Sequence, residues 1–191
     1  GIPAQQHQAA FEAFAVFLGA TRPSRILEIG TAGGGFILWV RDVLNALELP
    51  NVPVKSFDIV EQQWYAQIRQ WNVEITVENI FDESYSRLAL PERVVPFIQE
   101  PGTTVVMCDG GNKIAEFGIF APFLKVGDFI MAHDYVDTKE NFEANYLGKI
   151  WEWCEVEEAA IADASVANLL EHCAQDLFDP VVWVCKRKMR A

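Results

Sequence analysis

The stretch of residues 25–39, RILEIGTAGGGFILW, constrains the fold of this chain more than any other. A short apolar run, interrupted only by Glu28, leads into a turn in which four of the six residues 30–35 are glycine. Apolar residues at helical spacing follow over residues 36–47. This order predicts a buried strand, a tight turn and a helix. Because glycine tolerates positive φ and has no side chain, such a turn lets a nucleotide-like cofactor approach the backbone where the strand ends.

Two classes of cofactor fit this turn. Gly30, Ala32 and Gly35 form an incomplete dinucleotide fingerprint, but a dinucleotide site expects an acid about 20 residues further on, and the strand-end acid Asp58 comes later. Sites for S-adenosylmethionine (SAM) instead place an acid two residues before the first glycine, as Glu28 does. A carboxylate in an apolar strand is costly unless it is paired, and the cationic methionine head of SAM or ordered water would pair it. A third interpretation is an ordinary turn whose Glu28 is satisfied by backbone groups.

The composition is that of an ordinary globular protein. The 191 residues suffice for a single domain, 1–191, in which residues 1–22 form an N-terminal helical segment. Hydrophobic residues make up 51% and charged residues 22% of the chain. The net charge of −12 repels phosphate backbones, so we expect no nucleic-acid partner. We recognise neither a run of about 18 apolar residues nor a signal peptide, so we expect no membrane partner.

The four cysteines are also those of an ordinary globular protein. They lack CxxC spacing and paired histidines, so they do not predict a zinc site: Cys108, Cys154, Cys173 and Cys185. Reduced thiols are the simplest interpretation, and they favour a cytoplasmic location.

Apolar runs and helical patterns alternate along the chain. Strands are expected at 26–29, 54–59, 73–77, 103–108 and 129–132, and helices at 5–18, 36–47, 62–70, 91–98 and 114–124. This alternation predicts an α/β fold with a doubly wound, mostly parallel, Rossmann-like sheet and helices on both faces. Towards the end of the chain we expect helices at 145–153 and 164–173, a short strand at 155–161 and a last strand at 181–186.

In order and spacing, these signals resemble the class I SAM-dependent methyltransferases, and more narrowly the branch of cephalosporin hydroxylase-like proteins and macrolide sugar O-methyltransferases. Residues 28–34, EIGTAGG, are close to the EIGTxxGG of that branch. Asp109 and Gly110 follow the fourth strand, and residues 127–134, GDFIMAHD, are similar to GGYIVVHD or GGxIxxDD. The resemblance implies a seven-stranded sheet whose final strand is antiparallel. It also implies methyl transfer to a small-molecule acceptor.

The resemblance further implies which residues contact the cofactor. The glycine turn would hold the methionine part of SAM, Asp58 would accept hydrogen bonds from both ribose hydroxyls, and adenine would lie near Phe81. Asp82 is a candidate partner for the adenine amino group, although Asp58 and Asp82 can equally be turn or helix-capping residues. The expected cofactor-binding residues are Glu28, Gly30, Thr31, Ala32, Gly34, Asp58, Asn79, Ile80 and Asp109.

On the acceptor side, the resemblance implies a divalent ion, Mg or Mn, held by Asp109, His133 and Asp134. Such an ion would orient acceptor oxygens and lower the pKa of a hydroxyl. His133 stands where an acid is more usual, and imidazole suits Zn, Fe, Ni or Mn better than Mg. His133 and Asp134 are also adjacent, so they can share an ion only if the strand has already turned.

The general base stays open at this point. The family places a histidine where this chain has Asn112, which cannot take a proton at neutral pH. Lys113 can replace it only if burial lowers its pKa, and is otherwise a solvated lysine at a helix start. His133 is the other candidate, acting without a metal, or else it is a hydrogen-bonded strand-end residue. The candidate catalytic residues are Asp109, Lys113, His133 and Asp134.

We therefore expect a SAM-dependent methyltransferase acting on a small-molecule hydroxyl, with or without a divalent metal. The alternative is a non-catalytic SAM-binding protein or partner subunit, favoured by Asn112 and His133. A NAD-dependent oxidoreductase is a weaker alternative. Trp151 and Trp153, with Tyr135 and Tyr146, either wall an aromatic acceptor pocket or belong to the core. The sequence identifies neither the acceptor nor the oligomeric state, and a homo-oligomer is one of the states that it leaves open.

Overall fold

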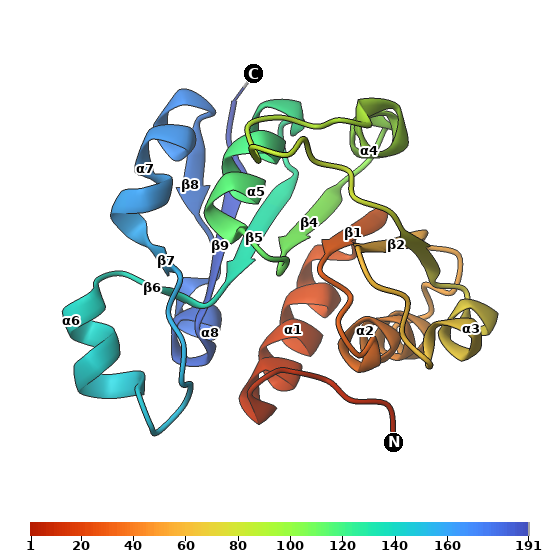
Figure 1. Cartoon of the computed structure of the whole chain (residues 1–191), viewed down its shortest axis with the longest axis horizontal. Helices are drawn as coiled ribbons and strands as arrows, with labels where there is room; N and C mark the ends of the chain where they lie inside the picture. The colour runs from red at the N-terminus through yellow and green to blue at the C-terminus, as the bar shows by residue number, and fades with distance from the viewer. Residues whose placement is uncertain (191) are drawn as a thin grey trace.

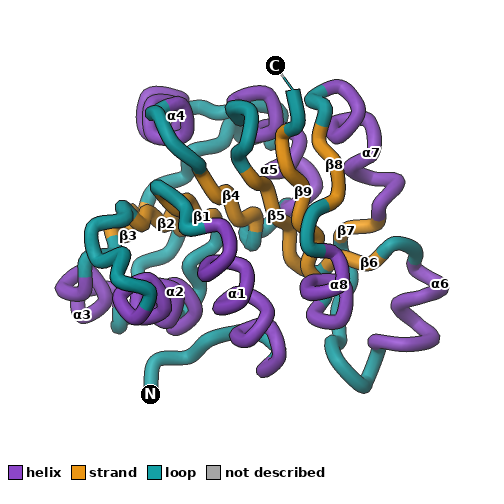
Figure 2. The backbone as a smooth tube through the Cα atoms, turned by 180° about the vertical axis from the view of Figure 1, so that it is seen from behind, coloured by secondary structure: helices purple, strands orange, loops and turns teal. Residues whose placement is uncertain are grey.

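The computed structural model describes residues 1–190 and contains a seven-stranded sheet of strand order β3-β2-β1-β4-β5-β9-β8 (Figures 1 and 2). Five strands pair in parallel: β1 (Arg25–Ile29), β2 (Val54–Asp58), β3 (Glu74–Val77), β4 (Thr104–Cys108) and β5 (Phe129–His133). β9 (Trp183–Lys188) is antiparallel to β5 and to β8 (Leu170–His172). β6 (Tyr135–Val136) and β7 (Val156–Glu157) form a separate parallel pair. The predicted fold class, including the antiparallel final strand, is confirmed.

Helices cover both faces of the sheet because alternate strand residues point to opposite sides. Val105 and Met107 of β4 belong to one core cluster, and Val106 and Cys108 to another. The first cluster packs under α1 (Gln8–Thr21), α2 (Gly35–Ala46), α3 (Tyr65–Ile68) and α8 (Gln175–Phe178). The second packs under α4 (Pro91–Gln99), α5 (Lys113–Phe120) and α7 (Glu158–Ala167). β1, β4 and β5 are buried along their whole length, which explains the nearly continuous apolar sequences of β4 and β5.

The strand order reverses between β1 and β4. In open α/β sheets, ligands bind outside the carboxyl ends of the strands at such a switch point. Here the two strand ends are joined directly, because the Asp109 amide donates to the Ile29 carbonyl over 2.9 Å. The glycine turn after β1 and the segment after β4 therefore lie side by side.

Four predicted helices and one predicted strand have wrong boundaries. The helix expected at 62–70 begins at Tyr65, and the strand expected at 155–161 covers only β7 because α7 begins at Glu158. The first helix begins at Gln8 rather than at residue 5, because the preceding residues lie against the glycine turn. Residues 147–153 are not helical: Gly148 has a φ of 70°, and a bridge joins Leu147 to Trp151. The helix expected at 164–173 ends at Ala167, because the following residues turn back to pair as β8 with β9.

The remaining short elements lie at one end of the sheet. α6 (Lys139–Asn141) continues into a π-helical turn, Phe142–Tyr146, away from the main body (Figure 1). No helix within residues 1–190 has the length and apolar character that crossing a bilayer requires.

Candidate active site

The glycine turn is shaped by backbone geometry that only glycine adopts readily. Gly30 has a φ of 89°, and a Cβ atom there would lie 2.1 Å from the Asp109 carbonyl oxygen. Gly34, with a φ of 80°, caps the start of α2. The Gly35 amide donates to the Pro3 carbonyl over 2.9 Å. Residues 3–6, which we call the N-terminal strap, thus lie across the turn and run from the start of α1 toward α2 (Figure 1).

Glu28 is buried in β1 and has a protein partner that sequence analysis missed. The Ser56 hydroxyl donates to the Glu28 carboxyl, and its oxygen lies 2.6 Å from the Thr31 hydroxyl oxygen. Glu28 and Ser56 lie opposite each other on β1 and β2. The sequence signal for this pair was Ser56 itself, a polar residue within the second predicted strand. Burial raises the pKa of Glu28 to about 8, the hydrogen bond from Ser56 opposing this shift.

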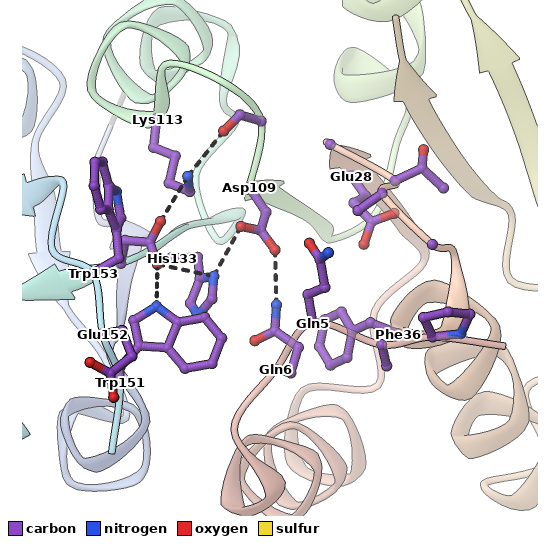
Figure 3. A pocket seen from close by; sticks show the side chains of 18 of the residues that line it. Gln5, Gln6, Glu28, Phe36, Asp109, Lys113, His133, Trp151, Glu152 and Trp153 are labelled. Carbon is purple, nitrogen blue, oxygen red and sulfur yellow. Dashed lines mark hydrogen bonds and ion pairs between the residues drawn. The ribbon is translucent and has the colours of Figure 1, made fainter. Parts of the chain in front are cut away.

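A cavity of about 630 Å³ extends from the glycine turn to the ends of β4 and β5. Figure 3 shows Glu28 and Phe36 on one side, and Asp109, His133 and Trp151 on the other. Strap residues Gln5 and Gln6 also line it. Its volume lies within the range typical of small-molecule sites.

Asp109 and His133 form a hydrogen-bonded pair inside this cavity. Asp109 Oδ1 lies 3.0 Å from His133 Nδ1, and Asp109 Oδ2 accepts from the Gln6 amide over 2.9 Å (Figure 3). Gln6 Oε1 in turn accepts from Trp183 Nε1 over 2.9 Å. The His133 ring stacks on Trp183 at a centroid distance of 4.8 Å, and the tilted Trp151 ring has its centroid 4.9 Å away. His133 Nε2 is buried and has no hydrogen-bond partner.

The chain turns at Asp134, which brings its side chain into the same cavity as His133. Asp134 has a φ of 56°, so the regular strand ends at His133. The condition under which two adjacent residues could face one site is therefore met. Asp134 Oδ1 accepts from Trp151 Nε1 over 2.7 Å, and Asp134 Oδ2 lies 2.9 Å from Lys113 Nζ.

Lys113 is buried at the start of α5 and is not a solvated lysine. Its ammonium group also contacts the Gly110 carbonyl and Glu155 Oε2, each at 3.0 Å. Burial alone would lower the pKa of Lys113, but the contact with Asp134 and the other acids raise it above its ordinary value. The lowered pKa that a base at this position requires is therefore not found.

The predicted metal ligands come together, but their oxygens already have protein donors. Asp109 is bonded to His133 and Gln6, and Asp134 to Trp151 and Lys113. An ammonium group 2.9 Å from Asp134 would also repel a divalent ion. Across residues 1–190, no group of three or more His, Cys, Asp or Glu side chains is arranged to hold a metal. The residues in this arrangement do not fit a divalent ion.

A smaller cavity of about 80 Å³ lies on the other side of Gly30, and it is lined by Asp58, Asn79, Ile80 and Phe81. Within the protein, Asp58 Oδ2 accepts from the Ala32 amide over 2.8 Å and Oδ1 from the Val60 amide over 3.0 Å. The Tyr65 hydroxyl lies 3.1 Å from Asp58 Oδ2 and 2.9 Å from the Ala32 carbonyl oxygen, and its one hydrogen goes to one of the two. Because a carboxylate has about four lone-pair sites, Asp58 retains capacity for two ribose hydroxyls when Tyr65 donates to Ala32, and for one when Tyr65 donates to Asp58.

The acid near this smaller cavity is not the expected one. Asp82 is bound by Ser84 and Ser86 in its own turn, which lowers its pKa to about 2, and it lines neither cavity. Glu116 of α5 lines the smaller cavity instead and accepts from the Gly110 and Asn112 amides. Burial raises the pKa of Glu116 to about 7. Glu116 lies in an amphipathic helix, and nothing in the sequence indicated that it would line this cavity.

The aromatic residues divide between the two interpretations. Trp151 and Trp153 line the large cavity, and 62% of Trp153 is exposed. Tyr135 is buried, with its hydroxyl bonded to Glu158, and Tyr146 packs on a small cluster around Phe142. Of these four residues, the two tryptophans therefore wall the cavity and the two tyrosines do not.

No protein-family model and no curated protein sequence matches the chain. Solved structures do. An apo structure of CmcI has a TM-score of 0.66 at 14% identity, over 97% of this chain and 73% of that one. An O-methyltransferase family protein from Burkholderia thailandensis has a TM-score of 0.61 at 10% identity, over 96% and 56%. A CmcI structure with Mg and SAM has a TM-score of 0.61 at 15% identity, over 95% and 72%. At these identities the likeness concerns the fold, and the fold is that of the methyltransferases the sequence resembles.

Proposed function

We propose that this protein is a SAM-dependent methyltransferase that methylates a hydroxyl group of a small-molecule acceptor. The observation that carries the proposal is the single cavity that joins the glycine turn to the Asp109–His133 pair. A methyl donor and a base would therefore reach the same space. The shared fold of an O-methyltransferase family protein and of CmcI, which is known in a structure with Mg and SAM, supports it.

The residues around Gly30 fit SAM. Gly30 lines both cavities, so an extended cofactor crossing it would have its methionine part in the larger cavity and its adenosine part toward the smaller one. Gly30, Ala32 and Gly34 present backbone to the methionine part, and Glu28 accepts from its amino group. Asp58 accepts from one ribose hydroxyl, and Asn79 and Ile80 border the adenine. When bound, SAM supplies an electrophilic methyl group on a sulfonium that leaves as a neutral thioether.

His133 is the proposed base. Asp109 accepts the Nδ1 hydrogen, which fixes the tautomer whose lone pair is at Nε2. Because Nε2 is buried, the acceptor hydroxyl must displace neighbouring groups to reach it. The hydroxyl then gives its proton to Nε2 while its oxygen bonds to the methyl carbon. Most of the acceleration comes from holding that oxygen in line with the sulfonium, and Trp151 and Trp153 supply walls for this. Metal assistance is not part of the proposal, because the carboxylate oxygens of Asp109 and Asp134 already accept hydrogen bonds from other side chains.

Calorimetry with SAM and with its demethylated product S-adenosylhomocysteine tests the proposal. We expect both to bind, and we expect Asp58→Ala to weaken binding by roughly 1–3 kcal/mol, the range for hydrogen bonds to charged groups. Failure of both ligands to bind at millimolar concentration would overturn the proposal. Binding of NAD in their place would favour the oxidoreductase alternative.

The alternative of a non-catalytic SAM-binding protein rests on Asn112, whose side chain caps α5 by accepting from the Ala115 amide. It predicts cofactor binding without turnover on a panel of catechols, sugars and polyketides. Turnover on one acceptor, abolished by His133→Ala, would refute this alternative.

A further inference from the structure

The Lys113 ammonium is surrounded by oxygens from three separate segments. These are the Gly110 carbonyl after β4, Asp134 Oδ2 after β5 and Glu155 Oε2 before β7, at 3.0, 2.9 and 3.0 Å. Figure 3 shows the Lys113 side chain reaching into the cavity. The residue is only 7% exposed. Its three hydrogens therefore have three acceptors within the protein.

This set of acceptors is the kind that a hard divalent cation takes. Magnesium is bound through one or two carboxylates with further oxygens, and calcium also accepts backbone carbonyls. The distances here are those of charged N–H···O bonds, far longer than the 2.0–2.1 Å of Mg–O contacts. The oxygens thus enclose an ammonium and are spaced for one.

We propose that the Lys113 ammonium is a built-in cation that replaces a divalent metal ion at this site. It neutralises Asp134 and Glu155, which would be costly to bury without a partner. It also fixes the segment that carries Trp151 and Trp153. Lys113 is accordingly a positioning residue, and its influence on methyl transfer rests on the proposed function, whereas its replacement of the metal does not.

The contacts around Glu155 show how the ammonium orders this segment. Glu155 Oε1 accepts from the Lys113 amide over 2.7 Å while Oε2 contacts the ammonium, so both carboxylate oxygens are bound to one residue. The Glu155 and Val156 amides donate to the Asp134 carbonyl over 3.0 Å each. Trp151 closes the arrangement through Asp134 Oδ1. One lysine therefore connects α5, the end of β5 and the cavity wall.

Removing the ammonium should create a metal site. In Lys113→Ala, the Gly110 carbonyl, Asp134 and Glu155 would converge on free space with two negative charges and no cation. We expect the wild-type protein, titrated with Mn²⁺ and followed by the electron paramagnetic resonance signal of free Mn²⁺, to bind no stoichiometric ion. We expect Lys113→Ala to bind one equivalent at least roughly tenfold more tightly than wild type, a difference of about 1.4 kcal/mol. Adding Asp134→Asn should abolish the gain.

Lys149→Ala is the matched control, because Lys149 lines the same cavity but donates only to the Ala144 carbonyl. It should titrate like wild type. Lys113→Met, which keeps the aliphatic stem, replaces Lys113→Ala if the latter does not fold by circular dichroism. One equivalent of Mn²⁺ on the wild-type protein, lost in Asp134→Asn, would overturn the proposal. So would folded Lys113 variants that bind no Mn²⁺. None of these measurements uses cofactor or acceptor, so a failure of SAM to bind leaves their outcome unaffected.

Discussion

At the scale of single residues, the His133 ring is held by its neighbours rather than by its own strand. Asp109 fixes its Nδ1 side, the Trp183 indole stacks on the ring at a centroid distance of 4.8 Å, and the tilted Trp151 indole lies 4.9 Å away. A ring fixed in this way needs no reorientation when an acceptor hydroxyl arrives, which favours proton transfer from a positioned group.

His133→Ala should lower kcat by roughly 10²–10⁴-fold, the range for loss of a general base. Its dissociation constant for SAM should stay near the wild-type value, since His133 lies on the acceptor side of the cavity. Initial rates and calorimetry on the same preparations measure both. His172→Ala is the control, because His172 pairs with Glu158 and lines neither cavity. Equal losses in the two variants would exclude His133 as the base.

Glu28 should make stability depend on pH. Its folded-state pKa of about 8 lies above the value of 4.5 expected when it is exposed, so the folded protein binds a proton that the unfolded chain releases. The stabilisation is complete below about pH 4.5 and is lost as the pH rises through about 8. Glu28→Gln should therefore gain stability over wild type across this window, by at most about 1.4 kcal/mol per pH unit. Urea denaturation at several pH values measures this, and exposed Glu12→Gln should show no such trend.

At the scale of elements, the glycine turn joins β1 to α2 only if Gly30 keeps its conformation. Gly30→Ala would place a Cβ atom 2.1 Å from the Asp109 carbonyl at a φ of 89°. We expect a loss of roughly 2–4 kcal/mol in unfolding free energy, combining overpacking with backbone strain, and a loss of SAM binding. Gly118→Ala in α5 meets no atom within 4 Å, so it should be neutral or stabilising by up to about 1 kcal/mol. Thermal unfolding of Gly30→Ala and Gly118→Ala, compared with wild type, measures these two changes in stability.

The strands and the glycine turn could be predicted because their signals are local. β1, β4 and β5 are buried on both faces, so most of their residues are apolar and the strands are visible without tertiary information. Residues 147–153 also contain apolar side chains, and these suggested a helix. Their actual conformation depends on the bond from Trp151 to Asp134, which lies 17 residues away. Long-range contacts of this kind leave no periodic pattern in the sequence.

The same distinction applies to the candidate site. Asp109, His133 and Asp134 were found through the resemblance to the methyltransferases, whose motifs assign site residues after the fourth and fifth strands. The carboxyl edge of the sheet gathers residues at those strand ends. Gln6 is 103 residues from its partner Asp109, and no local rule connects the two. Burial lowers the pKa of Lys113 and its acidic partners raise it. One of these partners, Glu155, is 42 positions away, so the sequence did not reveal the outcome.

At the scale of the whole molecule, the N-terminal strap connects the two halves of the sheet edge. Pro3 is bonded to the start of α2 on one side, and Gln6 links Asp109 to Trp183 of β9 on the other. Residues 3–6 also line the large cavity. The strap is thus a wall of the proposed SAM site that is contributed by neither the sheet nor a helix.

Deleting residues 1–6 should leave the fold intact, because α1 begins at Gln8 and its buried residues remain. SAM binding should weaken by about tenfold, since the cavity loses a wall and Asp109 loses the amide of Gln6. Gln6→Ala alone should reproduce the part of this loss that comes from the contacts of Gln6 with Asp109 and Trp183. Calorimetry on the wild type, the deletion and Gln6→Ala separates this part from the loss of the cavity wall. Tighter binding after the deletion would mean that the strap occupies space the cofactor needs. In that case the strap would restrict access to the glycine turn, and residues 3–6 would have to move before SAM could bind.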